Sequence, residues 1–117
     1  MAELKRYAVR VAERKKELQH ALARFAEVCA GDATVEAAYV YGSFAQGRIG
    51  PESDLDLLVV RNTNLPQHDR ADDLIAAAQG RIRLDIIVVT PQEFRQRLPT
   101  TTFGTTILES MRRIDAT

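Results

Sequence analysis

The first 30 residues alternate apolar and polar positions with the period of an α-helix. Apolar side chains recur at steps of four and three, and only Lys15 interrupts the stripe: Leu4, Ala8, Val11, Leu18, Leu22, Phe25 and Cys29. We therefore predict one long helix over residues 3–29, ended by Gly31 in a left-handed conformation. At 1.5 Å per residue it is about 40 Å long, more than one face of a small domain can cover. Its first turns are expected either to project or to pack on another chain; the alternative is that the whole stripe is core.

Three short segments further along the chain have the composition of β-strands. They are Val35–Tyr41, Asp54–Val60 and Leu84–Val89, each rich in Val, Ile, Leu or Tyr and bounded by turn residues. Their hydrophobicity is almost continuous, which is typical of strands covered on both faces. We therefore predict a sheet between helices.

Helical signals separate and follow these strands. One helix is expected to begin at Pro66 and to end at Gly80, a second to begin at Pro91 and to end before Pro99, and a third to lie around residues 105–112. The resulting order of elements predicts a single α/β domain over residues 1–117, with residues 1–30 as a long N-terminal helix.

Composition and charge exclude several classes of function. The chain has 117 residues, and its 16 basic and 16 acidic side chains cancel. Nucleic acid is therefore not expected as the main partner, and no apolar run reaches the roughly 18 residues that a membrane span needs. A secretory signal is not apparent, and one cysteine, Cys29, cannot form an internal disulfide, so we expect a cytoplasmic protein.

The negative charge gathers in the middle of the chain. Residues 52–73 hold six acidic side chains against two arginines, a local charge of −4. Alternation along the second strand places Asp54 and Asp56 on one face, roughly 6–7 Å apart. Asp85 interrupts the third strand and can join them if the two strands are neighbours. Carboxylates packed this closely repel each other unless a cation lies between them, and Mg²⁺ is the hard ion that suits such oxygen ligands.

A second motif, Gly42-Ser43, stands where the first strand ends. Gly42 permits a tight turn, and the backbone N–H groups of Ser43 and Phe44 begin a helix. Such a helix start is a ready site for an anion, and the Ser43 hydroxyl adds a donor. The same turn can also be a simple strand-to-helix corner. Followed ten residues later by Asp54-x-Asp56, however, it indicates a phosphate site beside a cation site.

The run GSFAQGRIGPESDLDLLVV, together with Asp85 in a later strand, resembles the DNA polymerase beta-like nucleotidyltransferase superfamily, and its minimal nucleotidyltransferase (MNT) branch in particular. The similarity covers about residues 35–94. It implies a small mixed sheet flanked by helices, and transfer of a nucleoside monophosphate from ATP or another NTP. Many such domains are similar in being paired with an all-helical HEPN toxin, which the MNT protein silences by adenylylation.

The resemblance also implies roles for individual residues. Asp54, Asp56 and Asp85 would be catalytic and hold two Mg²⁺ ions, about 3.5–4 Å apart, while Gly42, Ser43 and Arg48 would bind the nucleotide. Family members often carry arginines where this chain has Phe44 and Gln46, and Arg48 is the expected substitute.

Two alternatives to a protein adenylyltransferase antitoxin stay open at this point. One is an antitoxin that acts by occlusion and keeps a site without catalysis. The other is a small-molecule, antibiotic-type adenylyltransferase, although 117 residues leave little chain for an acceptor pocket. A helical HEPN-type partner is expected, and self-association through the long helix is a further possibility.

Overall fold

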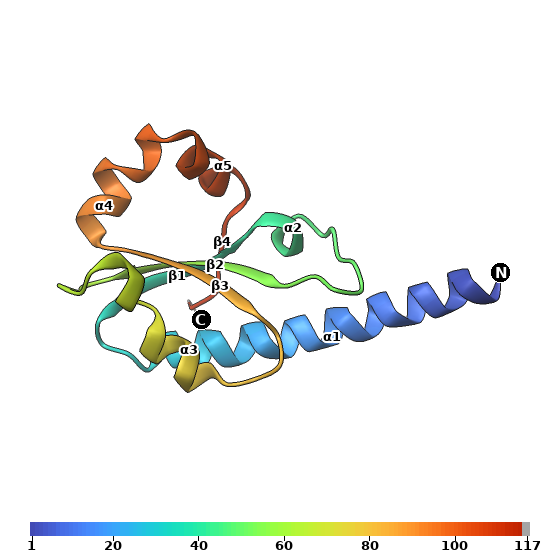
Figure 1. Ribbon diagram of the computed structural model, residues 1–117. Helices are drawn as coiled ribbons and strands as arrows, with labels where there is room; N and C mark the ends of the chain where they lie inside the picture. The colour runs from blue at the N-terminus through green and yellow to red at the C-terminus, as the bar shows by residue number, and fades with distance from the viewer. Residues whose placement is uncertain (116–117) are drawn as a thin grey trace.

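The computed structural model describes residues 1–115, which form a four-stranded mixed sheet between two layers of helices (Figure 1). The strand order is β3-β2-β1-β4; β2 runs parallel to β3, whereas β1 is antiparallel to both β2 and β4. The strands are β1 (Val35–Tyr41), β2 (Leu55–Arg61), β3 (Leu84–Val89) and β4 (Arg112–Arg113). The helices are α1 (Ala2–Ala30), α2 (Gly42–Ala45), α3 (Asp72–Ala78), α4 (Pro91–Gln96) and α5 (Thr102–Ser110).

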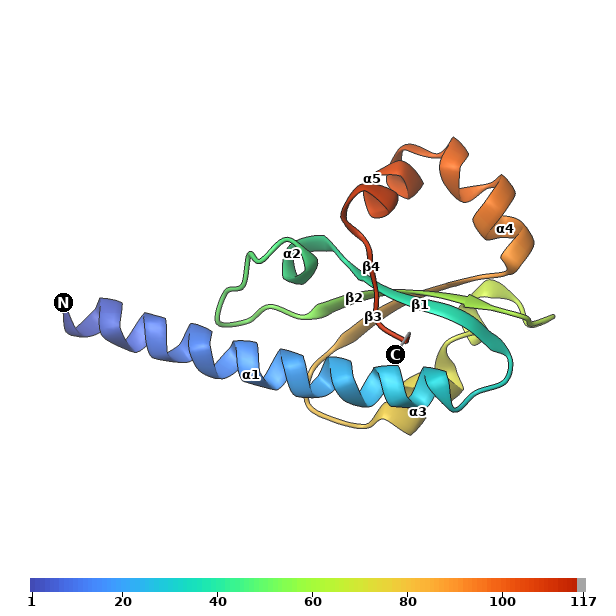
Figure 2. The ribbon, with the colours of Figure 1, turned by 180° about the vertical axis from the view of Figure 1, so that it is seen from behind.

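Side chains of the central strand alternate between two hydrophobic cores. Leu55 and Leu57 pack with α1 and α3 on one face, whereas Leu58 and Val60 pack towards α4 and α5 on the other. Figure 2 shows the same two layers from behind, with α1 and α3 below the sheet and α4 and α5 above it. Both faces are covered, as the continuous hydrophobicity of the strands predicts.

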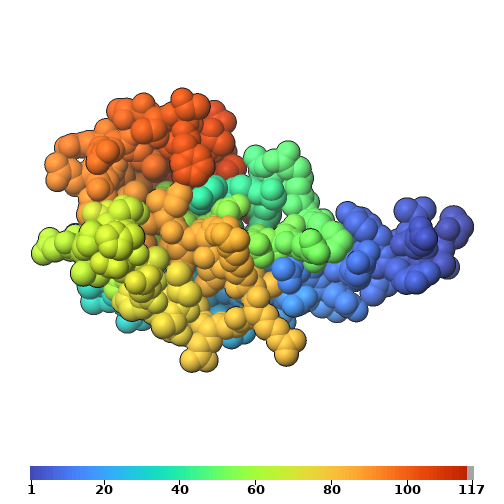
Figure 3. Space-filling view, viewed as in Figure 1, coloured from blue at the N-terminus to red at the C-terminus, as the bar shows by residue number. Residues whose placement is uncertain are grey.

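The long helix α1 belongs to the core over only its second half. Leu18, Phe25 and Cys29 are buried, but every residue from 1 to 10 is exposed. The first turns project well beyond the body of the molecule (Figures 1 and 3) and contribute to its long dimension, 52 × 30 × 28 Å. The predicted helix is confirmed, but the predicted left-handed cap is wrong. Gly31 has φ −86° because the chain continues through a right-handed turn, in which its N–H donates to Glu27 O.

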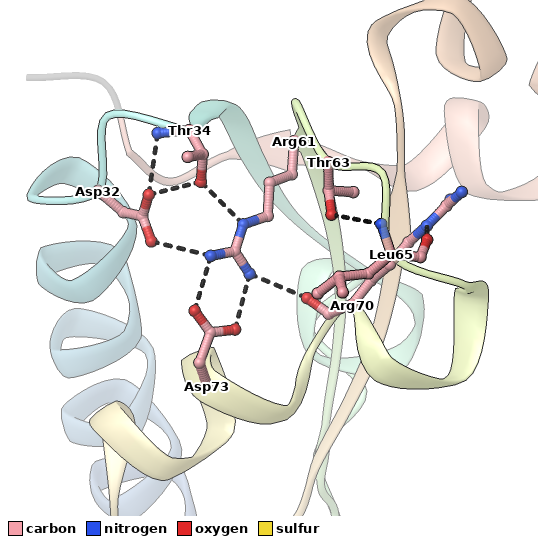
Figure 4. Close-up of polar contacts among 7 residues, drawn as sticks. All are labelled: Asp32, Thr34, Arg61, Thr63, Leu65, Arg70 and Asp73. Atoms are coloured by element: carbon pink, nitrogen blue, oxygen red, sulfur yellow. Dashed lines mark hydrogen bonds and ion pairs between the residues drawn. The ribbon is translucent and has the colours of Figure 1, made fainter.

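A buried arginine joins the lower layer to the sheet (Figure 4). Arg61, at the end of β2, donates two hydrogen bonds of 2.7 Å to the Asp73 carboxylate of α3. It also donates to Thr34 Oγ1 at 2.8 Å and to the Arg70 carbonyl at 2.9 Å, and pairs with Asp32 at 3.2 Å. This network fixes the start of α3 against the loop that follows α1, and so holds the lower layer beneath β2.

The predicted elements are present, but several of their ends differ: α3 is much shorter than the helix predicted from Pro66 to Gly80, and α5 spans Thr102–Ser110 rather than residues 105–112. The second strand begins at Leu55 rather than at Asp54, and α3 begins at Asp72 after a short 3₁₀ turn over Gln67–Asp69. The strand β4 was not predicted, because two exposed arginines carry no strand pattern. It forms because Tyr39 and Val40 of β1 offer an open edge. None of the helices within residues 1–115 is both long and apolar enough to cross a membrane.

Candidate functional site

The three predicted aspartates lie at the start of the two parallel strands. Asp56 and Asp85 are direct partners in the register of β2 and β3, and Asp54 immediately precedes β2. The alternation that sends Leu55 and Leu57 into the lower core places Asp56 on the face of α4 and α5. The second and third strands are therefore neighbours, which is the condition for Asp85 to join the other two acids, and the three carboxylates share one neighbourhood.

Their charges influence one another, as the pKa of Asp56 shows. Burial raises the pKa of this carboxyl above its usual range, and the negative charges of Asp85 and Asp54 raise it further. Tyr41, the partner of Asp56 in the register of β1 and β2, responds to the same charges. Burial, with Asp56 and Asp85 beside it, raises the pKa of Tyr41 to about 12. A cation beside these groups would lower the electrostatic cost of this arrangement.

Two of the three carboxylates, those of Asp54 and Asp85, are paired with arginines. Arg14, in the middle of α1, donates to the Ser53 carbonyl at 2.9 Å and to Asp54 Oδ1 at 3.5 Å. Figure 2 shows the loop after α2 passing close to the middle of α1, where these contacts occur. Arg83 pairs with Asp85 at 3.1 Å, and this pair is largely exposed. Within residues 1–115 no three acidic, histidine or cysteine side chains are gathered closely enough to form a preassembled metal cluster.

Gly42 is required by the position of Asp56. The residue has φ +74°, in the left-handed region that favours glycine, and a Cβ added to it would lie 2.6 Å from Asp56 Oδ2. The Asp56 carboxylate therefore rests against the backbone of the turn that opens α2. The Gly42 N–H donates to Ser110 Oγ at 3.2 Å, which ties this turn to the last residue of α5.

The predicted phosphate side lies next to these acids. Ser43 is exposed at the start of α2, and no side chain of residues 1–115 caps this helix. Arg48 comes back to the same turn, because its backbone N–H donates to the Ser43 carbonyl at 2.8 Å. Its guanidinium contacts Gln46 Oε1 at the surface, and Phe44 packs partly against the lower core. The structure thus places Gly42, Ser43 and Arg48 on one turn, beside Asp56.

Three residues of this neighbourhood escaped the sequence analysis. Arg14 is one of many basic residues in α1, so nothing singled it out. The one available signal was its position four residues before the apolar Leu18, which puts both side chains on the same, inward face of the helix. Tyr41 was assigned only to a strand, and nothing in the sequence distinguished Ser110 from other polar residues of the last helix.

The donor set fits a hard divalent cation bound together with phosphate. Carboxylate oxygens are the ligands that Mg²⁺ prefers, and the open α2 turn offers N–H and hydroxyl donors to an anion beside it. The pair between Arg83 and Asp85 is exposed and therefore weak, roughly 0–1 kcal/mol, so a cation can displace it at little cost.

Comparisons with known proteins show which family this chain resembles. The family model described as "Polymerase beta, Nucleotidyltransferase" matches residues 24–108, which include Gly42, Ser43 and the three aspartates but not Arg14. The chain is also similar to a protein of Sulfolobus solfataricus, assigned to the nucleotidyltransferases, whose crystal structure was determined at 1.40 Å resolution. The two share 26% identity and a TM-score of 0.55, over 74% of this chain and 79% of that chain. A search of curated protein sequences finds no significant match.

Proposed function

This chain belongs to the polymerase beta nucleotidyltransferase family, and we propose that it transfers AMP from ATP to a hydroxyl group of a partner protein. The observation that carries the proposal is the packing of the Asp56 carboxylate against Gly42, with Asp85 alongside in register. This arrangement sets the turn at Gly42 and Ser43, which we assign to phosphate binding, directly beside the carboxylates of Asp56 and Asp85. Transfer of a phosphoryl-type group requires both kinds of site side by side.

Each part of the site has a role in this reaction. Ser43 and the N–H groups at the start of α2 bind the β- and γ-phosphates, with Arg48 on the same turn. The acceptor hydroxyl oxygen attacks the α-phosphorus. A new O–P bond forms as the bond to pyrophosphate breaks, and the hydroxyl proton passes to Asp85. No protein nucleophile is needed.

Asp54, Asp56 and Asp85 are the residues that would hold magnesium. When bound, the metal would neutralise the charge of the phosphates and polarise the attacking hydroxyl. Asp54 and Asp85 must first leave Arg14 and Arg83, and both of these contacts are partly open to solvent.

The projecting half of α1 is proposed as the surface that docks the partner. Leu4, Tyr7 and Val9 are 69%, 49% and 55% exposed, so this part of the helix displays apolar side chains that the domain itself does not cover. An all-helical HEPN-type toxin fits this surface, because a helix can pack along a helix. The protein would then act as its antitoxin.

The test uses ATP labelled in either the α- or the γ-phosphate, with Mg²⁺ and the natural partner. Adenylylation places only the α-label on the partner, whereas phosphorylation would place only the γ-label. We expect Asp56→Asn to abolish labelling and also the stabilisation by Mg²⁺-ATP, which reaches about 2.7 kcal/mol at a hundredfold excess over the dissociation constant.

Glu52→Gln is the matched control, because it removes an exposed carboxylate from the same loop and should leave both results unchanged. If a complex with the natural partner forms but never becomes labelled, the protein acts by occlusion and the proposed transfer is wrong.

A further inference from the structure

Phe103, in the first turn of α5, is an exposed aromatic side chain on the same face of the sheet as the acids. At 58% exposed it is the most exposed aromatic residue within residues 1–115. Single exposed apolar side chains are common on protein surfaces. The place of Phe103, rather than its exposure alone, is what indicates a role.

One face of α5 connects Phe103 to the phosphate turn. Phe103, Ile107 and Ser110 follow one another at steps of four and three, so they share this face. Ile107 is buried in the upper core, and Ser110 Oγ accepts the hydrogen bond of 3.2 Å from the Gly42 N–H. In Figure 3 the red surface of α5 lies beside the green surface of α2. This face therefore extends from the phosphate turn to Phe103, about 10 Å along the helix axis.

Tyr41 connects Phe103 to the carboxylates. The ring centroids of Tyr41 and Phe103 are 6.4 Å apart. Tyr41 is also the register partner of Asp56, and both side chains lie on the face of α4 and α5. Burial, together with the charges of Asp56 and Asp85, raises the pKa of Tyr41 to about 12. Only one side chain thus separates Phe103 from the Asp56 carboxylate.

The orientation of the two rings leaves Phe103 a free surface. Their planes meet at 82°, an edge-to-face arrangement in which at most one face of each ring is covered. At least one face of Phe103 is therefore not taken by Tyr41. The pair of Tyr39 and Phe94 differs, because these rings stack on each other at 5.8 Å and 10° and pack against the upper core.

The order of residues along the turn indicates which part of a nucleotide reaches Phe103. Ser43, on the phosphate side, follows Gly42, whereas Tyr41, which contacts Phe103, precedes it. The Asp56 carboxylate rests against Gly42, between the two. A nucleotide whose terminal phosphates lie at Ser43 and whose α-phosphate lies at Asp56 extends its nucleoside towards the side of Phe103. An aromatic ring is a suitable platform there, because every base has a face that stacks on one.

We propose that Phe103 is the platform on which the base of the bound nucleotide stacks. The inference rests on the proposed function and adds to it a residue that recognises the base. The ligand is a nucleoside triphosphate, held by its phosphates at the α2 turn and by its base on α5.

Calorimetry without the partner protein tests this contact. The probe is α,β-methylene-ATP with Mg²⁺, in which the bond to pyrophosphate cannot break, and its counterpart is inorganic tripolyphosphate, which has no base. Phe103→Ala should weaken binding of the ATP analogue about tenfold and leave binding of tripolyphosphate unchanged. Unchanged tripolyphosphate binding also shows that the variant keeps the fold of the phosphate turn.

Two further substitutions separate stacking from simple apolar contact. Phe103→Leu keeps the bulk but not the aromatic face, and it should lose nearly as much affinity as Phe103→Ala. Phe103→Trp should bind at least as tightly as the wild type. The matched control is Leu65→Ala, which shortens a side chain of similar exposure, 48%, in the segment between β2 and α3, and it should bind both ligands like the wild type.

The tryptophan of the Phe103→Trp variant reports stacking directly, because the chain has no other tryptophan. Its fluorescence should be quenched by the ATP analogue and not by tripolyphosphate. The tryptophan of a Leu65→Trp variant should respond to neither ligand.

Three results would overturn the proposal alone: unchanged affinity of Phe103→Ala for the analogue, full affinity of Phe103→Leu, or equal quenching of the two tryptophans. If neither the analogue nor tripolyphosphate binds the wild type, the proposed function fails and this inference fails with it. Binding that depends on Phe103, in a protein that never labels its partner, would support the platform and count against the proposed transfer alone.

Discussion

Replacing Gly42 by alanine should damage both the fold and the site, for two separable reasons. The backbone there has φ +74°, and a residue with a Cβ costs roughly 1–2 kcal/mol in that region. The new Cβ would also lie 2.6 Å from Asp56 Oδ2, so this carboxylate must retreat by about 0.8 Å before ordinary contact is restored. Displacing a packed side chain costs about 1–3 kcal/mol more. The expected loss of unfolding free energy is therefore about 2–5 kcal/mol.

Gly47 provides the matched control within the same loop. It has φ +76°, but a Cβ there meets no atom of the described part of the chain, residues 1–115, within 4 Å. Gly47→Ala should therefore lower the unfolding free energy only by the cost of the left-handed backbone conformation, roughly 1–2 kcal/mol. It should keep any stabilisation by Mg²⁺-ATP. The difference between the two variants isolates the contact with Asp56.

Urea unfolding followed by circular dichroism, in EDTA, measures both losses. A double-mutant cycle with Asp56→Ala completes the test, because removing the carboxylate removes the atom that the new Cβ meets. Gly42→Ala should then cost at least about 1 kcal/mol less in the Asp56→Ala background. Equal losses at Gly42 and Gly47, or no coupling between Gly42 and Asp56, would refute the reasoning.

Two further predictions concern the long helix and the buried arginine. Leu4→Glu with Tyr7→Glu should weaken binding of the natural partner, as measured by calorimetry, and leave the melting temperature nearly unchanged, because both side chains are exposed; a large fall in melting temperature would assign these turns to the core. Arg61→Met should cost about 1–3 kcal/mol at pH 7, since it removes charged hydrogen bonds to Asp73 and Asp32. The hydrogen bonds from Arg61 hold the pKa of Asp73 below its usual range, so the stability that they contribute is present above about pH 4 and lost as the pH falls further. Urea unfolding from pH 7 to pH 3 should therefore show a steeper loss in wild type than in Arg61→Met, and parallel curves would contradict this assignment.

Local patterns determined the secondary structure of this protein almost completely. The apolar stripe of α1 repeats with the period of a helix. The apolar runs of β1, β2 and β3 have the length of buried strands, so each pattern is compatible with few other types of secondary structure. Alternation alone placed Asp56 away from Leu55 and Leu57, because successive side chains of a strand point to opposite faces; Asp54 lies just before the strand and contacts Arg14 of α1. The Gly42-Ser43 turn and the acids could therefore be recognised before any contact was known.

Contacts between distant segments were decided only by the tertiary structure. The parallel register that sets Asp85 beside Asp56 depends on how β3 packs after a long crossover, and spacing along the chain does not encode it. The same holds for Arg14, which reaches Asp54 from 40 residues away, and for β4, which exists because β1 has an open edge. The stripe of α1 likewise could not show where the core ends, since its exposed Leu4 and buried Leu18 follow one periodic pattern. A periodic pattern identifies the face of a helix, but the rest of the fold determines how much of that face is covered.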